Sequence, residues 1–135
     1  MEAKEIAKKL KEIAPRLADT YGLDFLILFG SAARGAVKRT SDIDIGVSGR
    51  LSFKDELSLA VELSDIFGDT RVDLVNLQRV SPLLAHSASH EALLIYERTP
   101  GDFARFRMRA FHIFVETKPL REAAFERTKQ YSKQT

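Results

Sequence analysis

The sequence predicts an α/β (α+β) fold in which helices pack on a small mixed β-sheet. Short apolar runs of strand length alternate with longer segments that carry apolar residues at helical spacing. The chain has 135 residues, 44% of them hydrophobic, which suits one domain with a single core. We therefore expect one domain over 1–135, made of an N-terminal helix (1–20), a core that carries the motifs described below (21–98) and a helical C-terminal segment (99–135).

Composition narrows the classes of protein to which the chain can belong. No apolar run is long enough to span a bilayer, and the N-terminal stretch MEAKEIAKKLKEIA is charged throughout, unlike a signal peptide. The absence of cysteine excludes disulfides and thiolate metal sites, which is compatible with a cytoplasmic protein. Residues 19–98 carry 8 Lys and Arg against 12 Asp and Glu, whereas residues 99–135 carry 8 against 4. An acidic core therefore precedes a basic C-terminal segment.

Apolar periodicity and helix-ending residues place each element along the chain. Apolar residues recur at helical spacing in 2–19, and Gly22 ends this helix. Ser81-Pro82 starts a later helix, and Pro119 is expected to break or kink the C-terminal helix. The expected elements are a helix over 2–19, a strand over 25–29, a short helix after Gly30, a strand that Gly49 ends, a helix over 53–67, a strand over 72–77, a helix over 81–91, a strand over 93–96 and helical structure from 102 onward.

Two aspartates stand out within residues 28–47, LFGSAARGAVKRTSDIDIGV. Asp42 and Asp44 are two residues apart in an apolar run, so in a strand both point to one face, while the intervening Ile43 points to the other. Neighbouring carboxylates repel each other and raise each other's pKa unless a cation lies between them. Ligand sets made only of oxygen favour Mg²⁺ or Mn²⁺. The pair therefore predicts a divalent metal site.

Gly30 and Ser31 close the preceding apolar run and open a short helix. Such a turn offers free backbone N–H groups, a hydroxyl, and no bulky side chain that would keep a phosphate away. The turn and the aspartates are only about a dozen residues apart. Together they predict a site for a nucleotide bound with a metal.

These residues resemble the minimal nucleotidyltransferase (MNT) branch of the DNA polymerase beta-like nucleotidyltransferase superfamily. The family pattern is an apolar strand, then G-S-x-A-R-G, a short spacer, and S-D-x-D in the next strand. The matching residues here are Gly30, Ser31, Ala33, Arg34, Gly35, Ser41, Asp42 and Asp44. The family also has a third carboxylate on a later strand, which Asp73 supplies in the run RVDLVNL. The resemblance covers residues 21–96 well, and the helical C-terminal part more loosely.

The resemblance implies a polymerase beta-like nucleotidyltransferase fold, with ATP as the substrate and a two-metal mechanism. The implied catalytic residues, which are also the implied ligands of two Mg²⁺ (or Mn²⁺) ions, are Asp42, Asp44 and Asp73. The implied nucleotide-binding residues are Gly30, Ser31, Arg34, Gly35 and Ser41. Arg34 is expected either to contact phosphate or to pair with an acid.

MNT proteins typically pair with a HEPN protein as antitoxin and toxin, and transfer AMP to a tyrosine of that toxin. The resemblance therefore implies a protein adenylyltransferase that acts as an antitoxin on a HEPN partner. Two alternatives stay open: an antitoxin that neutralises its partner by binding alone, and a nucleotidyltransferase that modifies a small molecule or an RNA end. A homo-oligomer is also open, whereas neither a membrane nor a nucleic acid is expected as a partner.

The C-terminal segment carries more apolar surface than one helix seam needs, much of it from phenylalanine. This surface is expected either to dock a partner or a second copy, or to cover the sheet. The first alternative places the docking surface on the aromatic and basic residues 102–135.

Two histidine motifs suggest other chemistry. His86 and His90 have metal-ligand spacing on a helix, but no third ligand is visible, which favours a structural pair. Arg107 and His112 match the short R-x(4-6)-H pattern of HEPN-type ribonucleases. That pattern needs a helical bundle around it, and most of this chain is expected to alternate strand and helix.

Overall fold

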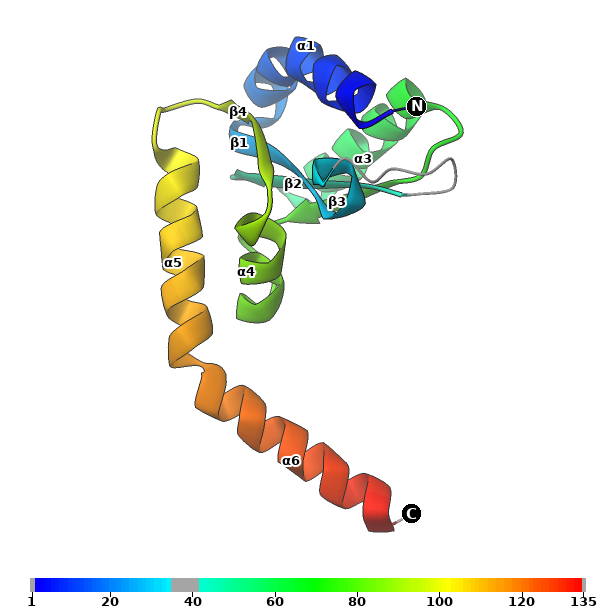
Figure 1. Cartoon of the computed structure of the whole chain (residues 1–135). Coiled ribbons are helices and arrows are strands. Elements are labelled where there is room, and N and C mark those ends of the chain that lie inside the picture. The colour runs from blue at the N-terminus through cyan, green and yellow to red at the C-terminus, as the bar shows by residue number, and fades with distance from the viewer. Residues whose placement is uncertain (1, 35–41, 135) are drawn as a thin grey trace.

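The computed structural model describes residues 2–34 and 42–134, which form a four-stranded sheet with helices packed on it (Figure 1). The elements in chain order are α1 (Ala3–Tyr21), β1 (Leu23–Phe29), α2 (Gly30–Ala33), β2 (Ile43–Gly49), α3 (Phe53–Phe67), β3 (Val72–Asn76), α4 (Pro82–His90), β4 (Leu93–Glu97), α5 (Asp102–Glu116) and α6 (Lys118–Gln134). This order confirms the predicted α/β (α+β) architecture. The predicted bounds of α3 are also those of the structure.

The sheet is mixed, as predicted, with the strand order β3-β2-β1-β4. β1 pairs antiparallel with both β2 and β4, while β2 and β3 run parallel. A parallel pair needs a crossover connection, which α3 supplies. Because β1 and β2 are antiparallel, the end of β1 meets the start of β2, and the parallel β3 also starts at this edge.

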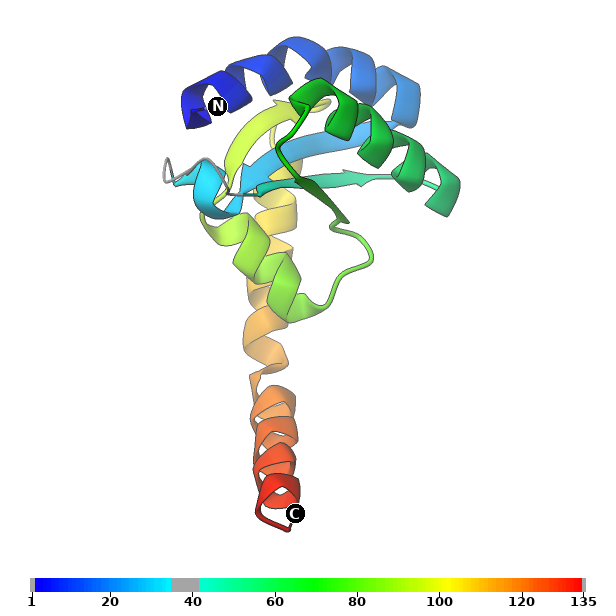
Figure 2. The same ribbon diagram turned by 90° about the vertical axis from the view of Figure 1, so that its right-hand side faces the viewer.

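Helices cover both faces of the sheet (Figures 1 and 2). α1 and α3 lie on one face, where Ile43 and Ile45 of β2 join the larger core cluster. α4 and α5 lie on the other face, where Phe103 of α5 packs with Phe25 and Ile27 of β1. Since side chains alternate along a strand, residues of β2 that lie between the buried isoleucines point toward the face of α4 and α5.

α1 is held by an apolar stripe. Ile6, Leu10 and Leu17 are fully buried, which confirms the predicted packing helix. The helix ends at Gly22, which has φ 67° and ψ 42° and whose N–H donates to the Ala18 carbonyl. Glycine is favoured at this left-handed capping position because it has no Cβ. No helix within the described part of the chain is long and apolar enough to cross a membrane.

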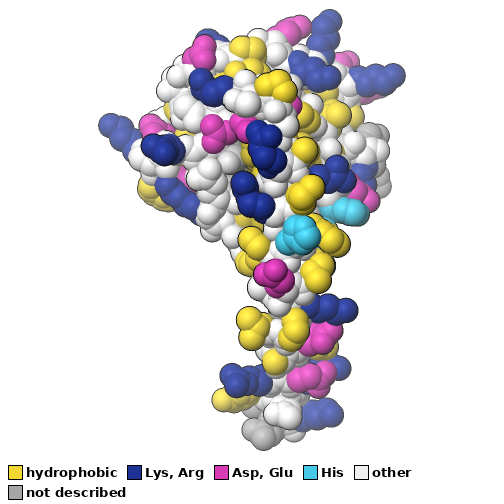
Figure 3. Space-filling view, turned by 90° about the vertical axis from the view of Figure 1, so that its left-hand side faces the viewer, with side chains coloured by type: hydrophobic (Ala, Val, Ile, Leu, Met, Phe, Trp, Pro, Cys, Tyr) yellow, Lys and Arg dark blue, Asp and Glu magenta, His cyan; other side chains and the backbone are white. Residues whose placement is uncertain are grey.

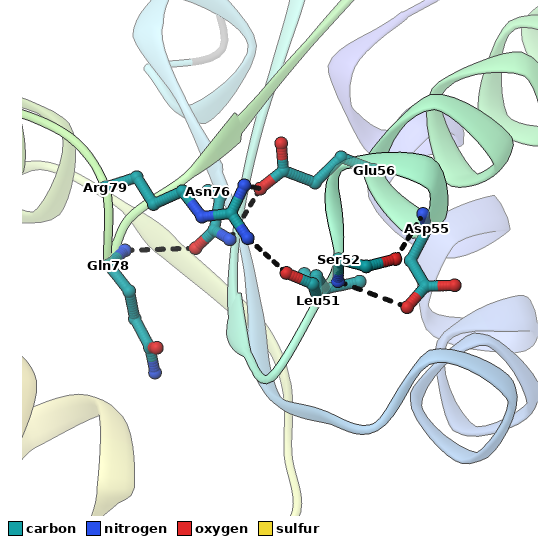
Figure 4. A network of polar contacts seen from close by, with 7 residues as sticks. All are labelled: Leu51, Ser52, Asp55, Glu56, Asn76, Gln78 and Arg79. Atoms are coloured by element: carbon teal, nitrogen blue, oxygen red, sulfur yellow. Dashed lines mark hydrogen bonds and ion pairs between the residues drawn. The ribbon is translucent and has the colours of Figure 1, made fainter.

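A polar network fixes the C-terminal ends of β2 and β3 to the start of α3 (Figure 4). The Glu56 carboxylate accepts from Asn76 Nδ2 at 2.7 Å and pairs with Arg79 at 3.1 Å. Ser52 and Asp55 form a capping box, in which each side chain accepts from the other residue's backbone N–H. The capping box satisfies two backbone N–H groups at the start of α3, those of Ser52 and Asp55.

The C-terminal segment breaks at Thr117, two residues before the predicted position at Pro119. The ring of a proline clashes with the carbonyl four residues earlier, here that of Val115, so a continuous helix is excluded before Pro119 is reached. Pro119 instead lies in the first turn of α6, where proline is tolerated. Arg121 donates to the Thr117 hydroxyl at 2.6 Å across this junction.

α6 extends away from the rest of the protein, and we refer to it as the C-terminal arm (Figures 1 and 2). α5 buries Phe103 and Ala110 against the body, whereas the arm has no buried residue up to Lys133. At the junction Phe114 stacks on His86 with ring centroids 4.2 Å apart, and the Arg121 guanidinium lies 4.0 Å from the same phenyl centroid. The phenylalanines of the C-terminal segment thus divide: Phe103 covers the sheet, as one alternative predicted, and Phe125 on the arm stays exposed.

Candidate active site

Two of the three predicted aspartates lie side by side at the edge where β1 ends. In the parallel pairing of β2 and β3, Asp44 is opposite Asp73. Neighbouring strands are about 4.8 Å apart, and opposed side chains project to the same face. Both residues are partly exposed, and Asp42 directly precedes β2. The fold therefore brings together carboxylates that are about thirty residues apart in the sequence.

Gly30 makes room for this pair. Phe29 is opposite Asp44 in the antiparallel register of β1 and β2, so the turn after β1 passes directly over the aspartate. Gly30 has φ +68°, and a Cβ at this position would lie 2.3 Å from Asp44 Oδ2. A side chain here would be strained by the left-handed backbone and would have to displace the carboxylate. The predicted phosphate turn and the predicted metal ligand are in contact.

Burial and like charge both act on Asp44. The pKa of this carboxyl is raised above its usual value, first by burial and then by the nearby charges of Asp73 and Asp42, while Arg34 lowers it. Desolvation and neighbouring anions both disfavour the ionised form. Within the described part of the chain, burial and the neighbouring carboxylates therefore outweigh the effect of Arg34 on the pKa of Asp44.

Arg34 lies at the end of α2 and pairs with an acid. Its Nη1 is 3.7 Å from Glu91 Oε2, and both side chains are more than half exposed. An exposed pair at this distance is weak, on the order of 0–1 kcal/mol, so the guanidinium is free to take another anion. The sequence predicted that Arg34 would either contact phosphate or pair with an acid. In this structure it pairs with Glu91, an acid that is not part of the motif.

The carboxylates suit a divalent cation. Among residues 2–34 and 42–134, no group of three or more His, Cys, Asp and Glu side chains is arranged to hold a metal ion. Mg²⁺, however, commonly uses only one or two carboxylates and completes its coordination with substrate phosphates and water. Asp44 and Asp73 offer two opposed carboxylates beside a turn that admits a phosphate, and Asp42 is the adjacent third.

Three further residues were predicted to bind nucleotide: Ser31, Gly35 and Ser41. Ser31 lies in α2, partly exposed, directly after Gly30. Gly35 and Ser41 lie outside the described residues, so their predicted contacts with nucleotide stay predictions.

Sequence reasoning missed two residues that contact the site. Glu91 follows α4 and reaches Arg34, and Arg71 Nε donates to Asp73 Oδ1 at 3.2 Å. Arg71 carried a signal in the sequence, because residues two apart in an extended segment share a face. Glu91 carried none, since only the packing of α4 beside the phosphate turn brings it near.

The histidines form a structural pair. His86 and His90 lie on α4 with ring centroids 5.3 Å apart, and His86 stacks on Phe114. The pKa of His86 is lowered by its burial and by the charges of His90, Arg121 and Arg107, which favours the neutral ring. Arg107 donates to the His90 carbonyl at 2.7 Å and so ties α5 to the end of α4.

Replacing Gly30 tests the contact between turn and carboxylate. We expect Gly30→Ala to displace the Asp44 carboxylate and to abolish the Mg²⁺-induced rise in melting temperature. Gly22→Ala is the matched control, because Gly22 has nearly the same φ (+67°) but no atom within 4 Å of an added Cβ. Both variants bear the backbone penalty of about 1–2 kcal/mol. Equal Mg²⁺ responses in the two would show that the Gly30–Asp44 contact is unimportant.

Replacing Asp44 tests whether burial and the neighbouring carboxylates make its ionised form unfavourable in the folded protein. A raised folded-state pKa means that ionised Asp44 disfavours the folded state, and that this cost is absent below the unfolded pKa. We expect Asp44→Asn, with chelator at pH 7, to raise the free energy of unfolding by no more than about 0.5 kcal/mol, given the solvent screening. At pH 4 the gain in the free energy of unfolding should be smaller than at pH 7. Urea unfolding at both pH values measures it, and a variant less stable than the parent at pH 7 would contradict the assignment.

The chain is similar in sequence to proteins named as protein adenylyltransferases. Protein adenylyltransferase MntA of Aphanizomenon flos-aquae (strain 2012/KM1/D3) is 26% identical over 138 residues, which cover 91% of this chain and 90% of the relative. MJ1379 of Methanocaldococcus jannaschii, which carries the provisional name of a protein adenylyltransferase, is 35% identical over 99 residues, 70% of this chain and 95% of the relative.

A solved structure has the same overall fold. A chain in the crystal structure of a toxin-antitoxin with AMP-PNP superposes with a TM-score of 0.76 at 25% identity. The superposition covers 88% of this chain and 98% of the other. The family model described as Polymerase beta, Nucleotidyltransferase matches residues 8–100, which contain every site residue described above. The chain is therefore a nucleotidyltransferase that belongs to the polymerase beta family.

Proposed function

We propose that this protein is a Mg²⁺-dependent protein adenylyltransferase that transfers AMP from ATP to a tyrosine hydroxyl of a HEPN toxin and thereby acts as its antitoxin. The observation that carries the proposal is the opposition of Asp44 and Asp73 beside Gly30, which offers neighbouring places for a cation and a phosphate. Similarity to MntA over 91% of this chain, and to a chain of a toxin-antitoxin with AMP-PNP, supports ATP and a protein acceptor.

The proposed reaction is a single displacement at the α-phosphorus of ATP. The tyrosine oxygen attacks the α-phosphorus of ATP, the bond between that phosphorus and the bridging oxygen to the β-phosphate breaks, and pyrophosphate leaves with this oxygen. The tyrosine proton passes to a carboxylate, for which Asp73 is our candidate. Bound Mg²⁺ supplies charge neutralisation at the phosphates and activates the attacking hydroxyl.

Each side chain of the site has a role in this scheme. Asp42, Asp44 and Asp73 would hold the cations. The N–H groups after Gly30 and the Ser31 hydroxyl would hold the outer phosphates. Arg34 would leave its weak pair with Glu91 and add positive charge beside the nucleotide.

The exposed apolar residues of α5 and of the C-terminal arm form our proposed docking surface for the toxin. Large apolar side chains are exposed along α5 and the arm, among basic residues (Figure 3). They are Met108, Phe111, Ile113, Val115, Leu120, Phe125 and Tyr131. Residues 99–135 carry 8 Lys and Arg against 4 Asp and Glu, so a partner face with apolar and acidic residues is complementary to it. An exposed apolar stripe of this length is typical of a protein interface.

The same surface supports one alternative, an antitoxin that neutralises its partner by occupation alone. The two functions differ in their requirements. Transfer needs ATP, Mg²⁺ and the aspartates, whereas occupation needs only the docking surface.

Measuring the intact mass of the HEPN protein tests for AMP transfer. The protein is incubated with ATP, Mg²⁺ and a candidate HEPN protein from the same genome, and we expect the HEPN protein to gain one or more AMP units. Asp42→Asn should slow this gain at least about a hundred-fold, since even outer-shell partners of metals cost about ten- to a hundred-fold. Asp65→Asn, the same change on the exposed surface of α3, should leave the rate unchanged. A tight complex without AMP transfer would favour occupation alone.

Substitution of two exposed leucines, one on the arm and one on α3, tests the proposed docking surface. Leu120 on the arm is 71% exposed and Leu57 on α3 is 55% exposed. We expect Leu120→Ser to weaken affinity for the HEPN protein about ten-fold or more, the effect of losing an interface anchor. Leu57→Ser should bind like the parent, and neither change removes a buried contact. Equal affinities for both variants, measured by calorimetry, would place the docking surface elsewhere.

A further inference from the structure

Arg71 gives the candidate site its own counter-charge. Its Nε donates to Asp73 Oδ1 at 3.2 Å, from just before the start of β3. The Arg71 side chain is 73% exposed and that of Asp73 is 38% exposed. This pair therefore lies at the mouth of the site and not in the core.

The sheet fixes the backbone of Arg71 beside the aspartates. Ile43, which lies between Asp42 and Asp44, donates its N–H to the Arg71 carbonyl at 2.8 Å. The pairing of β2 and β3 thus sets where the exposed Arg71 side chain begins, next to the segment that carries Asp42 and Asp44.

A cation bound between Asp44 and Asp73 would compete with the Arg71 guanidinium for the Asp73 carboxylate. Asp73 is opposite Asp44, and Arg71 Nε already occupies one of the two oxygens of that carboxylate. An exposed ion pair contributes only about 0–1 kcal/mol, so a cation can displace it, but at a cost to its own affinity.

We propose that Arg71 is a positioning residue: it neutralises Asp73 while the site lacks a cation and releases Asp73 when a divalent cation binds. This inference rests on the proposed function, because it takes Asp44 and Asp73 as the cation ligands. It adds that cation loading without nucleotide is opposed by the protein itself. After release, the guanidinium would be available to donate its N–H groups to the phosphates of an incoming nucleotide.

Mn²⁺ binding without nucleotide tests the proposal, with the signal of free Mn²⁺ read by electron paramagnetic resonance. We expect Arg71→Ala to bind Mn²⁺ about two- to five-fold more tightly than the parent, the range that an exposed ion pair supports. Arg71→Lys keeps the charge but loses the guanidinium geometry, and should fall between the two. Arg50→Ala is the matched control, because it removes the same exposed charge beyond the opposite end of β2 and should bind like the parent.

The outcomes separate this inference from the proposed function. If Asp44→Asn weakens Mn²⁺ binding but Arg71→Ala leaves it unchanged or weaker, the role of Arg71 is overturned and the cation site stands. If Asp44→Asn binds Mn²⁺ like the parent, the cation site itself is overturned, and the role of Arg71 with it. Tighter binding by Arg50→Ala, equal to that of Arg71→Ala, would show only a general charge effect and would also overturn the role of Arg71.

Discussion

The parallel pairing of β2 with β3 is the constraint on which the rest of this structure depends. It is the step that puts Asp73 opposite Asp44, and it requires the α3 crossover. α3 in turn is fixed at its start by the capping box and by the network around Glu56, at the far ends of the same two strands. Apolar packing of α1 and α3 on one face thus stabilises a register whose functional consequence lies on the other face.

That register brings like charges together, which the fold has to tolerate. Burial and the neighbouring carboxylates raise the pKa of Asp44, so the folded chain holds an arrangement that electrostatics alone would separate. β3 is paired with β2 along its whole length, and this pairing resists the separation because a shift would break backbone hydrogen bonds and move the buried isoleucines out of the core. Arg34 and Arg71 reduce the repulsion from the surface, where ion pairs are weak and exchangeable. Asp44 and Asp73 lie on paired strands, whereas Arg34 and Arg71 are exposed, and this arrangement suits a ligand that brings both a cation and phosphates.

The C-terminal segment divides its apolar residues between folding and the surface. Phe103 and Ala110 face the core and hold α5 against the sheet, while the arm beyond Thr117 buries none of its residues up to Lys133. The stack of His86, Phe114 and Arg121 joins α4, α5 and the arm at the point where the chain leaves the body. The arm therefore adds little to the core, and the exposed apolar residues that it carries have a physical rationale as an interface.

The sequence by itself determined the order of the elements and which residues are candidates for the site. Periodicities of two and 3.6 residues are local properties, so the strand that carries Asp44, the helix α3 and the break near Pro119 follow from short stretches of chain. The sequence also predicted Asp42 within this strand, whereas it directly precedes β2. The sequence also predicted Gly30 as part of a phosphate turn, and this role stays a prediction. Only the tertiary structure decided the strand order, the opposition of Asp44 and Asp73, and the contact between Gly30 and the Asp44 carboxylate. The ion pair of Arg34 with Glu91 also depended on it, because these residues are distant in sequence and meet only through the packing of α4. Local pattern states which side chains a segment can present, whereas the core packing of distant segments determines which of them meet.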